Sequence, residues 1–467
     1  MNQASRHSIA QLPPAFVTFS LTLIVYAVTL APGLTSAHFG GDGGELITAA
    51  ATLGVPHPQG YPTYTLLGKL ISLIPIGTAA LRFNFFSAFC IAAAAAVLTQ
   101  TAHEHSLNDI AAVGIGLTFA FTRLVWSQAL ITEVYGLNLL VLAVLLWACQ
   151  RQVAPVWLGA LWGLALTTHL TSLLMLPLVL WATEGKQLDR FAGGVALGLL
   201  PFATLPLLAR GDSVVVWSDP TTLQGWWWLV SGRIYRPNVF SHPLLPRLAD
   251  HALVILRQFA SVGWVIIGYG IWRGQFRPKT ILPFGTALAY TLYAFSYDTP
   301  DFAVFALPAV LLLAPYLAAG YQRLPMLGVA VPLALLILNF GAVNLRNDTT
   351  THDQAIQLLT SVPEQTILMT PGDESIFTLW YLQQVEIVRP DVILVDQNLF
   401  AFDWYRARLG RLYPSLQAVA VDDLDAFERH NLKFRPICSA SIHSYSAPRC
   451  VGPIQQESSD AAKAKSY

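Results

Sequence analysis

Residues 40–69 read GGDGGELITAAATLGVPHPQGYPTYTLLGK and follow directly on the first long apolar stretch of the chain. This segment brings an aspartate, a glutamate and a histidine together with three prolines and many glycines, although only 12% of the whole chain is charged. A soluble domain carries about 25% charged residues. A long, polar, glycine-rich loop in so apolar a chain is typical of a functional segment between membrane spans.

The charged residues are distributed unevenly around this segment. Of the Asp, Glu, Lys and Arg residues, 28 lie in residues 1–345 and 26 in residues 346–467, a region about a third as long. The sequence therefore predicts an α-helical polytopic membrane domain over 1–345 and a small soluble α/β domain over 346–455. The polar residues 456–467 are expected to form a disordered tail.

Apolar stretches of roughly 20 residues mark the expected spans. The stretch 156–182 could be one long tilted helix or two short helices that meet at a polar centre. Basic residues favour cytoplasmic loops, and placing every basic loop inside requires this stretch to cross twice or re-enter. We then expect about eleven spans, a cytoplasmic N-terminus, an outer C-terminal domain, and a first outer loop over about 32–82. The expected spans are 13–31, 83–102, 108–127, 136–150, two within 156–182, 190–209, 252–272, 281–297, 302–321 and 325–345.

Three further features complete the expected architecture: a surface helix, the elements of the C-terminal domain and a pair of cysteines. Residues 63–80 are apolar but interrupted by Lys69, Pro75 and Gly77, which favours a helix lying on the membrane surface. In the C-terminal domain, QTILMT and VEIVRPDVILVD resemble strands, and DESIFTLWYLQQ resembles a helix that Asp373 could cap. Cys438 could pair with Cys450 if this domain lies outside the cytoplasm.

The opening loop holds the first candidate functional groups. Asp42 and Glu45 are three residues apart, so they share a face near the start of the expected helix. One interpretation is that Asp42 only caps this helix and gains from its dipole. The other is a carboxylate that acts on a substrate at the membrane face, with His57 held in place by the prolines on either side.

Further candidates lie in later loops and span ends. Glu133 falls at the mouth of a span, where it is either an ionisable group with a function or an acid exposed to water. His169 lies in the middle of the stretch 156–182 and could be a hydrogen-bonded helix break. Asp301 lies in an expected outer turn. Arg233 and Arg236 could contact lipid phosphate or the phosphate of a substrate.

These segments resemble a family of bacterial and eukaryotic membrane proteins related to protein O-mannosyltransferases. The family pattern is Asp-x-Gly-Glu, then His-Pro-x-Gly-Tyr-Pro, then a surface helix, and GDGGELITAAATLGVPHPQGYPTYTLLGKL matches it. GTAALRFNFFSAFCIAAAAAVL, WGLALTTHLTSLLMLPLVL, YDTPDFAVFALPAVLLLA and GDESIFTLWYLQQVEIVRPDVILVD are also similar to this family. The chain resembles, more loosely, the GT-C class of glycosyltransferases. The resemblance covers most of the chain.

The resemblance implies a GT-C-like membrane enzyme that takes a hexose, such as mannose, from a polyprenyl-phosphate carrier. The acceptor would be a protein hydroxyl or another exported group, and the enzyme would lie in the inner or plasma membrane. The catalytic acids would be Asp42, as general base, and Glu45, which would orient the acceptor or tune Asp42. The substrate-binding residues would be His57, Tyr61, Glu133, His169, Arg233, Arg236 and Asp301.

Two other classes of membrane protein are alternatives to this enzyme. A multi-span transporter or flippase of lipid-linked substrates should show inverted repeats, and the polar first loop has no counterpart in the second half of the sequence. A non-catalytic membrane assembly protein is the third alternative.

The sequence contains no P-loop and no GxGxxG after a strand, so no nucleotide is expected. No metal site is assigned, although Asp42, Glu45 and Glu133 could hold a divalent cation. The expected partners are membrane lipid, the donor and a protein or glycan acceptor, and no basic tract suggests nucleic acid.

Overall fold

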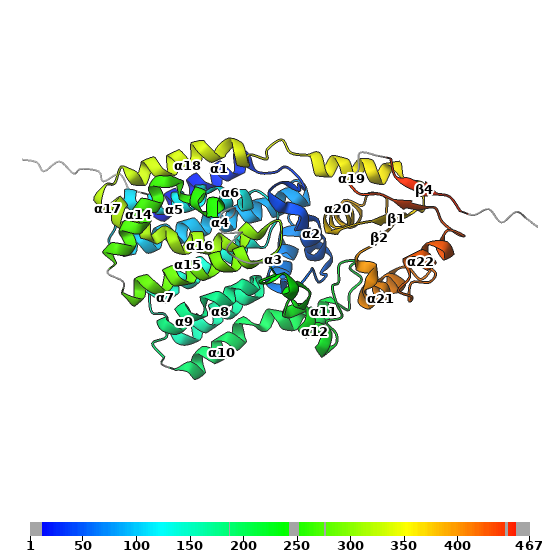
Figure 1. Cartoon of the computed structure of the whole chain (residues 1–467), viewed down its shortest axis with the longest axis horizontal. Coiled ribbons are helices and arrows are strands. Elements are labelled where there is room, and N and C mark those ends of the chain that lie inside the picture. The colour runs from blue at the N-terminus through cyan, green and yellow to red at the C-terminus, as the bar shows by residue number, and fades with distance from the viewer. Residues whose placement is uncertain (1–11, 186, 242–251, 275–276, 444–446, 454–467) are drawn as a thin grey trace, which may run out of the picture.

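The computed structural model describes residues 12–185, 187–241, 252–274, 277–443 and 447–453. The molecule is elongated, with a helical body at one end and a small α/β domain at the other (Figure 1). The expected tail 456–467 lies outside the described residues. The helices of the body are α1 (Pro14–Thr29), α4 (Ala79–Glu104), α5 (Asp109–Phe121), α6 (Arg123–Ala129), α7 (Tyr135–Gln150), α8 (Pro155–Thr168), α9 (Leu176–Ala182), α10 (Leu188–Gly198), α11 (Leu205–Leu208), α12 (Leu223–Val230), α14 (Ala260–Arg273), α15 (Pro278–Ser296), α16 (Leu307–Leu313), α17 (Ala318–Arg323) and α18 (Leu327–Val343).

Every stretch expected to span the membrane contains a helix. In the described part of the chain, four helices are long and apolar enough to cross a membrane, or five if a bent pair counts as one span. The four are Ala79–Glu104, Leu188–Leu208, Ala252–Arg273 and Phe302–Arg323. Shorter apolar helices are Pro14–Thr29, Tyr135–Gln150, Pro155–Thr168, Leu170–Ala182 and Leu327–Val343. These helices indicate a multi-pass membrane protein. The total of eleven spans remains a prediction.

Two of the predicted spans are broken. The stretch 108–127 is not one straight span, because α5 and α6 are bent by 70° at Thr122, whose extended backbone interrupts the helix. The stretch 156–182 consists of two short helices, as one of the two alternatives predicted. They meet at His169, which is also extended and whose ring accepts a hydrogen bond from the amide of Thr171.

The first outer loop folds into three short helices. These are the 3₁₀ helix η1 (Ala37–Asp42), α2 (Gly43–Thr52) and α3 (Pro62–Ser72). Helix α3 is shorter than the predicted surface helix 63–80, because Gly77, with φ of 62°, and Pro75 follow its end. The side chains of Leu70 and Leu73 are exposed, as expected for a helix that rests on a membrane surface.

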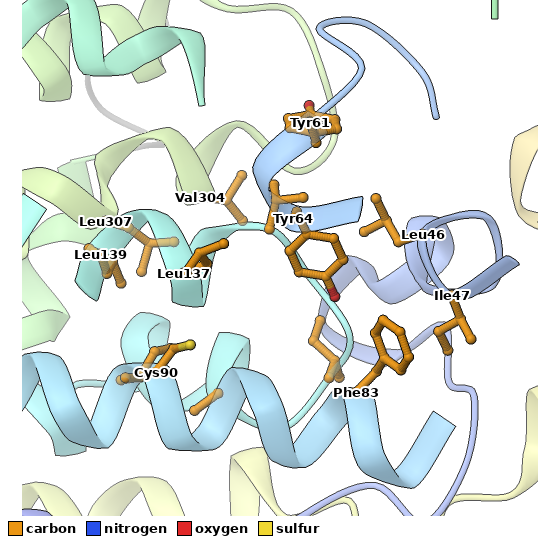
Figure 2. Packing of buried hydrophobic residues seen from close by; sticks show 14 of the residues in the cluster. Leu46, Ile47, Tyr61, Tyr64, Phe83, Cys90, Leu137, Leu139, Val304 and Leu307 are labelled. Carbon is orange, nitrogen blue, oxygen red and sulfur yellow. The ribbon is translucent and has the colours of Figure 1, made fainter. Parts of the chain in front are cut away.

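Helices α2 and α3 pack directly onto the membrane domain. Figure 2 shows Leu46 and Ile47 of α2 and Tyr64 of α3 beside Phe83 of α4, with Leu137 of α7 nearby. All five side chains are buried in one continuous hydrophobic cluster. The outer loop is therefore packed into the hydrophobic core of the membrane domain.

The C-terminal domain is a mixed four-stranded sheet with helices around it. Strand order is β2-β1-β3-β4; β1 pairs in parallel with β2 and β3, and β3 is antiparallel to β4. Cys438 and Cys450 face each other across β3 and β4 and form a disulfide, which confirms that predicted pair. The elements are α19 (Thr350–Ser361), β1 (Ile367–Thr370), α20 (Asp373–Gln384), β2 (Ile393–Asp396), α21 (Asp403–Leu412), α22 (Leu424–Asn431), β3 (Ile437–Ser439) and β4 (Arg449–Val451).

Two local expectations for this domain need correction. The strand predicted over VEIVRPDVILVD comprises only β2, because Ile387 and Arg389 have positive φ angles that a strand does not accommodate. Asp373 is the first residue of α20 and not its cap. The N-cap position is taken by Gly372, whose φ of 81° is accessible to glycine at little cost.

The C-terminal domain is packed tightly against the outer loop. Helix α20 lies on α2, and a Cβ atom on Gly44 would lie 2.4 Å from the carbonyl oxygen of Phe377. Only glycine allows the two helices to approach this closely. Elsewhere on the interface, the guanidinium of Arg408 donates to the carbonyl oxygens of Ser213 and Gly211.

Candidate active site

A cavity of about 670 Å³ lies where the outer loop, the span ends and the C-terminal domain meet. It is lined by six of the side chains selected from the sequence: Asp42, His57, Tyr61, His169, Arg236 and Asp301. These residues are up to 259 positions apart in the chain. The fold thus brings most of the predicted site together.

The loop before α2 has an unusual backbone that fixes the position of Asp42. His38 and Phe39 have φ angles of 57° and 66°, a region that residues other than glycine seldom occupy. The side-chain amide of Gln128 donates to the carbonyl oxygen of His38 at 2.9 Å, and His38 Nε2 lies 3.1 Å from the carbonyl oxygen of Val343. These contacts tie the loop to α6 and α18.

Glu45, His57 and Asp42 form a row of ionisable groups that ends at the cavity. His57 Nδ1 lies 2.5 Å from Glu45 Oε2, and the backbone amide of His57 donates to Glu45 Oε1 at 3.1 Å. On the other side of the ring, His57 Nε2 lies 3.7 Å from Asp42 Oδ2. The indole N–H of Trp217 also donates to Glu45 Oε1. Glu45 is fully buried and does not line the cavity, whereas 41% of the Asp42 side chain is exposed.

The local sequence explains how Glu45 and His57 meet. Helix α2 ends at Thr52. The next residue, Leu53, has a left-handed conformation, and the chain turns back so that His57 faces the start of the helix. Val55 then pairs with Val216 in a parallel β-bridge, which places Trp217 beside Glu45. The approach is close, since a Cβ on Gly54 would lie 2.3 Å from the carbonyl oxygen of Val215.

Burial and neighbouring charges set the ionisation of the two groups nearest the cavity. Desolvation raises the pKa of Asp42; the His57 charge opposes this shift and the Glu45 charge adds to it, giving a pKa of about 6. Desolvation alone would lower the pKa of His57, but the carboxylates of Glu45 and Asp42 outweigh it and raise the pKa to about 10. At neutral pH the cavity therefore presents an imidazolium ring beside a carboxylate.

Asp42 does not cap α2 with its side chain. It occupies the N-cap position, but within the described residues its carboxylate makes no capping hydrogen bond. Its backbone is helical, unlike the extended backbone of most N-caps. The carboxylate is instead available to groups inside the cavity.

The remaining predicted residues differ in their access to the cavity. Tyr61 lies between the two histidines, with its ring centroid 5.1 Å from that of His57 and 6.3 Å from that of His169. Asp301 accepts a hydrogen bond from Thr299 Oγ1. Glu133 is 3% exposed, so it is not an acid exposed to water, and it lies behind the cavity wall as the described residues define it.

Arg233 and Arg236, which were predicted as a pair, have different positions. Both side chains belong to the 3₁₀ helix η4 (Arg233–Asn238) and are exposed. Arg236 lines the cavity, whereas Arg233 is not among the lining residues that the structure describes. Of the pair, Arg236 is the cation placed to meet a bound anion.

Sequence reasoning missed two groups of residues at this site. The first is an aromatic lining: Tyr135, Tyr235, Tyr293, Tyr297 and Phe305. The second comes from the C-terminal domain, where Asp373 and Glu374 of α20 line the same cavity. The quoted motif GDESIFTLWYLQQ held a signal for the second group, since an acidic pair at a helix start resembles the pattern of the first loop.

The described residues contain no group of three or more His, Cys, Asp or Glu side chains arranged to hold a metal ion. Asp42 and Glu45 lie on either side of the His57 ring, with one oxygen of each carboxylate near a different ring nitrogen. This arrangement does not fit the divalent site that these two acids and Glu133 could have formed.

Comparison with protein-family models matches two regions of the chain. Residues 42–189 match the model described as "Protein O-mannosyl-transferase TMEM260 N-terminal domain", and residues 351–422 match "TMEM260-associated domain 2". The first region begins at Asp42 and includes the complete Asp42–Glu45–His57 arrangement. The second includes Asp373 and Glu374.

Two relatives in other organisms extend the similarity over most of the chain. The mouse protein named "Protein O-mannosyl-transferase TMEM260" is 29% identical over 85% of this chain. The protein of that name from Dictyostelium discoideum is 20% identical over 84% of this chain. The chain spans 64% of the mouse protein and 58% of the Dictyostelium protein.

Among solved structures, ArnT from Cupriavidus metallidurans bound to undecaprenyl phosphate superposes with a TM-score of 0.60. The match covers 91% of this chain and 92% of ArnT, at 16% sequence identity. The apo state of the same protein gives a TM-score of 0.54 at 15% identity. The chain is thus similar to proteins named protein O-mannosyl-transferase over most of its length, and it shares the GT-C fold of ArnT. The expected fold class, a GT-C-like helical membrane protein with a small C-terminal α/β domain, is confirmed.

Within this GT-C fold, the candidate site combines matched and unmatched regions. Asp42, Glu45 and His57 lie in the TMEM260 N-terminal domain match, and Glu374 lies in the second match. Arg236 lies between the two matches. The fold therefore joins the two matched domains at one cavity.

Proposed function

We propose that the protein is a membrane glycosyltransferase that moves a hexose, such as mannose, from a polyprenyl-phosphate carrier to a protein hydroxyl. The observation that carries this proposal is the Asp42 carboxylate, which faces the cavity beside a histidine held by a buried glutamate. The names of the two relatives support the sugar and the class of acceptor. The undecaprenyl phosphate bound to ArnT supports the class of carrier.

In the proposed reaction, the acceptor oxygen attacks the anomeric carbon of the donor sugar. Asp42 accepts the hydroxyl proton as general base. The bond between the anomeric carbon and the phosphate oxygen breaks, and its electron pair leaves with the polyprenyl phosphate. A single displacement of this kind inverts the configuration at the anomeric carbon.

Two cations lie at the cavity, and Arg236 is the one that suits the phosphate that leaves. Arg236 lines the cavity and donates in a planar, two-pronged geometry that matches phosphate oxygens. His57 is charged at neutral pH because of its carboxylate neighbours, and its Nε2 atom points toward Asp42. Glu45 acts as a positioning residue in this scheme, since it touches His57 and not the cavity.

We also propose that the cavity and the C-terminal domain face outside the cell membrane. The Cys438–Cys450 disulfide supports this orientation, because disulfides persist in oxidising compartments. The distribution of basic residues supports the same orientation. When the C-terminal domain lies outside, the predicted topology places the loops with Arg151, Arg273 and Arg323 in the cytoplasm, where basic residues are favoured.

The test uses the purified full-length protein with polyprenyl-phosphate mannose and a peptide that carries serine and threonine. We expect the wild type to mannosylate the peptide and Asp42→Asn to lower kcat/KM by roughly 10²- to 10⁴-fold, as for loss of a general base. Asp109→Asn, an exposed acid beside His103, is the matched control and should retain activity. Undiminished transfer by Asp42→Asn would refute Asp42 as the base, and the absence of transfer by the wild type would refute the function.

A further inference from the structure

Helix α20 of the C-terminal domain reaches the candidate active site. Its first residues, Asp373 and Glu374, line the same cavity as Asp42. One turn further along, the ring of Phe377 lies nearly parallel to the imidazole of His57, with 6.5 Å between centroids and 12° between planes. The C-terminal domain therefore contributes both to the wall of the cavity and to the surroundings of His57.

Close contacts fix α20 relative to Asp42. Gly44 of α2 leaves no room for a side chain against the backbone of Phe377, as described above. A Cβ on Gly41, the residue before Asp42, would lie 3.5 Å from Glu374 Cγ. Glu374 thus lies against the loop that carries the proposed base, and its place depends on two glycines of the outer loop.

The Glu374 carboxylate has one oxygen in contact with His443 and one oxygen that lacks a hydrogen-bond partner among the described residues. Oε2 lies 3.0 Å from His443 Nε2. Oε1 is buried and has no hydrogen-bond partner in the part of the chain that the structure describes. A buried carboxylate oxygen without a donor is costly, so a donor on a bound molecule would stabilise it.

Most of the acidic side chains that line the cavity lie on one wall. Three of the four carboxylates that line the cavity, those of Asp42, Asp373 and Glu374, belong to the wall formed by η1 and α20, and the fourth is Asp301. Carboxylates disfavour a phosphate nearby. Arg236 belongs to η4 and attracts phosphate. A neutral or cationic acceptor is therefore the substrate that suits the wall at α20.

We propose that Asp373 and Glu374 bind the hydroxyl-bearing acceptor, accepting hydrogen bonds from its N–H or hydroxyl groups and so directing its oxygen to Asp42. The C-terminal domain then determines which acceptor is used. This inference rests on the proposed glycosyl transfer and deepens it by assigning the acceptor subsite.

The experiment varies donor and acceptor separately, with purified full-length protein, polyprenyl-phosphate mannose and the serine- and threonine-containing peptide. Transfer to the peptide and transfer to water, which releases free mannose, are both measured. For Glu374→Gln we expect the acceptor KM to rise about tenfold, as for loss of a charged hydrogen bond. The donor KM should change far less, and the ratio of transfer to hydrolysis should fall. Asp373→Asn should change these quantities in the same direction.

Matched variants separate binding from structure. Glu364→Gln replaces an exposed acid of the same domain that does not line the cavity, and it should behave as wild type. His443→Gln removes the contact of the His443 ring with Glu374 and should affect the acceptor KM less than Glu374→Gln. An equal rise in donor and acceptor KM, or an effect of His443→Gln as large as that of Glu374→Gln, would overturn the inference. An unchanged acceptor KM in an active Glu374→Gln protein would also overturn it, whereas a wild type that never consumes the donor would overturn the proposed function itself.

Discussion

Glu45 shows how one buried side chain can organise a site without lining its cavity. Its carboxylate is fully buried and contacts the amide and ring of His57 and the indole of Trp217. A buried carboxylate is tolerated only when several donors compensate for its lost hydration. The spacing predicted that Glu45 and Asp42 share one helix face, and the structure places the His57 ring between their carboxylates.

The spacing of Asp42 and Glu45 predicted a shared helix face, but not which of the two would be buried. Periodicity indicates a face and says nothing about what covers it. Trp217 decides this point, and it reaches Glu45 through a bridge between residues 161 positions apart, Val55 and Val216. No local pattern in the sequence could have indicated that contact.

The pH dependence of transfer follows from the ionisation of the two cavity groups. Asp42 must be unprotonated to accept a proton, and its pKa is raised to about 6. The kcat/KM for transfer should therefore fall as pH decreases through about 6. His57 carries its charge below about 10, so activity should also fall as pH rises through that value. A bell-shaped profile measured from pH 5 to 11 checks this expectation.

The same profile distinguishes the two groups. In Asp42→Asn, the residual activity should no longer depend on pH near 6, because the titrating carboxylate is gone. An acid limb that persists unchanged in this variant would show that another group, or the substrate, is responsible.

At the scale of elements, local sequence signals predicted helices well and their ends less well. Apolar periodicity and length gave the positions of α1, α4, α7 and α18 to within a few residues. The 70° bend between α5 and α6 was missed because Thr122 carries no strong breaking signal, unlike proline or glycine. The bend allows α6 to approach the outer loop, where Gln128 contacts His38.

Because α2 and α20 are in close contact, we expect a side chain at Gly44 to destabilise the protein. In Gly44→Ala, the new methyl group would overlap the Phe377 carbonyl, and α20 would have to move. Overpacking of this kind costs about 1–3 kcal/mol. We expect a lower free energy of unfolding for the C-terminal domain, faster proteolysis between the domains and reduced sugar transfer.

Gly341 in α18 provides the matched control for this substitution. A Cβ at this position meets no atom within 4 Å in the described structure. Gly341→Ala should therefore retain activity and gain up to about 1 kcal/mol from helix propensity. Equal stability of Gly44→Ala and wild type would contradict the close packing of α2 and α20.

At the scale of the molecule, composition predicted an apolar part of the chain followed by a more charged part. It could not show that the two parts share one cavity. The docking depends on tertiary contacts such as those of Arg408 with the carbonyls of Ser213 and Gly211, which join residues about 200 positions apart. Burial of Arg408 at this interface lowers its pKa to about 10, so it stays charged at neutral pH.

The disulfide allows the orientation of the whole molecule to be tested. Protein extracted from cells in the presence of a thiol-blocking reagent should contain linked Cys438 and Cys450, visible as a mass increase only after reduction and alkylation. Its removal by Cys438→Ser should destabilise the C-terminal domain by about 2–4 kcal/mol. Free, alkylated thiols at both positions in native protein would contradict the proposed location outside the cytoplasm.

The stacking of Phe377 on His57 has a consequence for the order in which the protein is made. The ribosome completes Asp42, Glu45 and His57 early, whereas α20 is synthesised after the last helix of the membrane domain. Until α20 is in place, the site lacks the wall formed by Asp373 and Glu374. A partly synthesised chain should therefore be unable to select an acceptor, and glycosyl transfer should begin only after translation has passed the C-terminal domain.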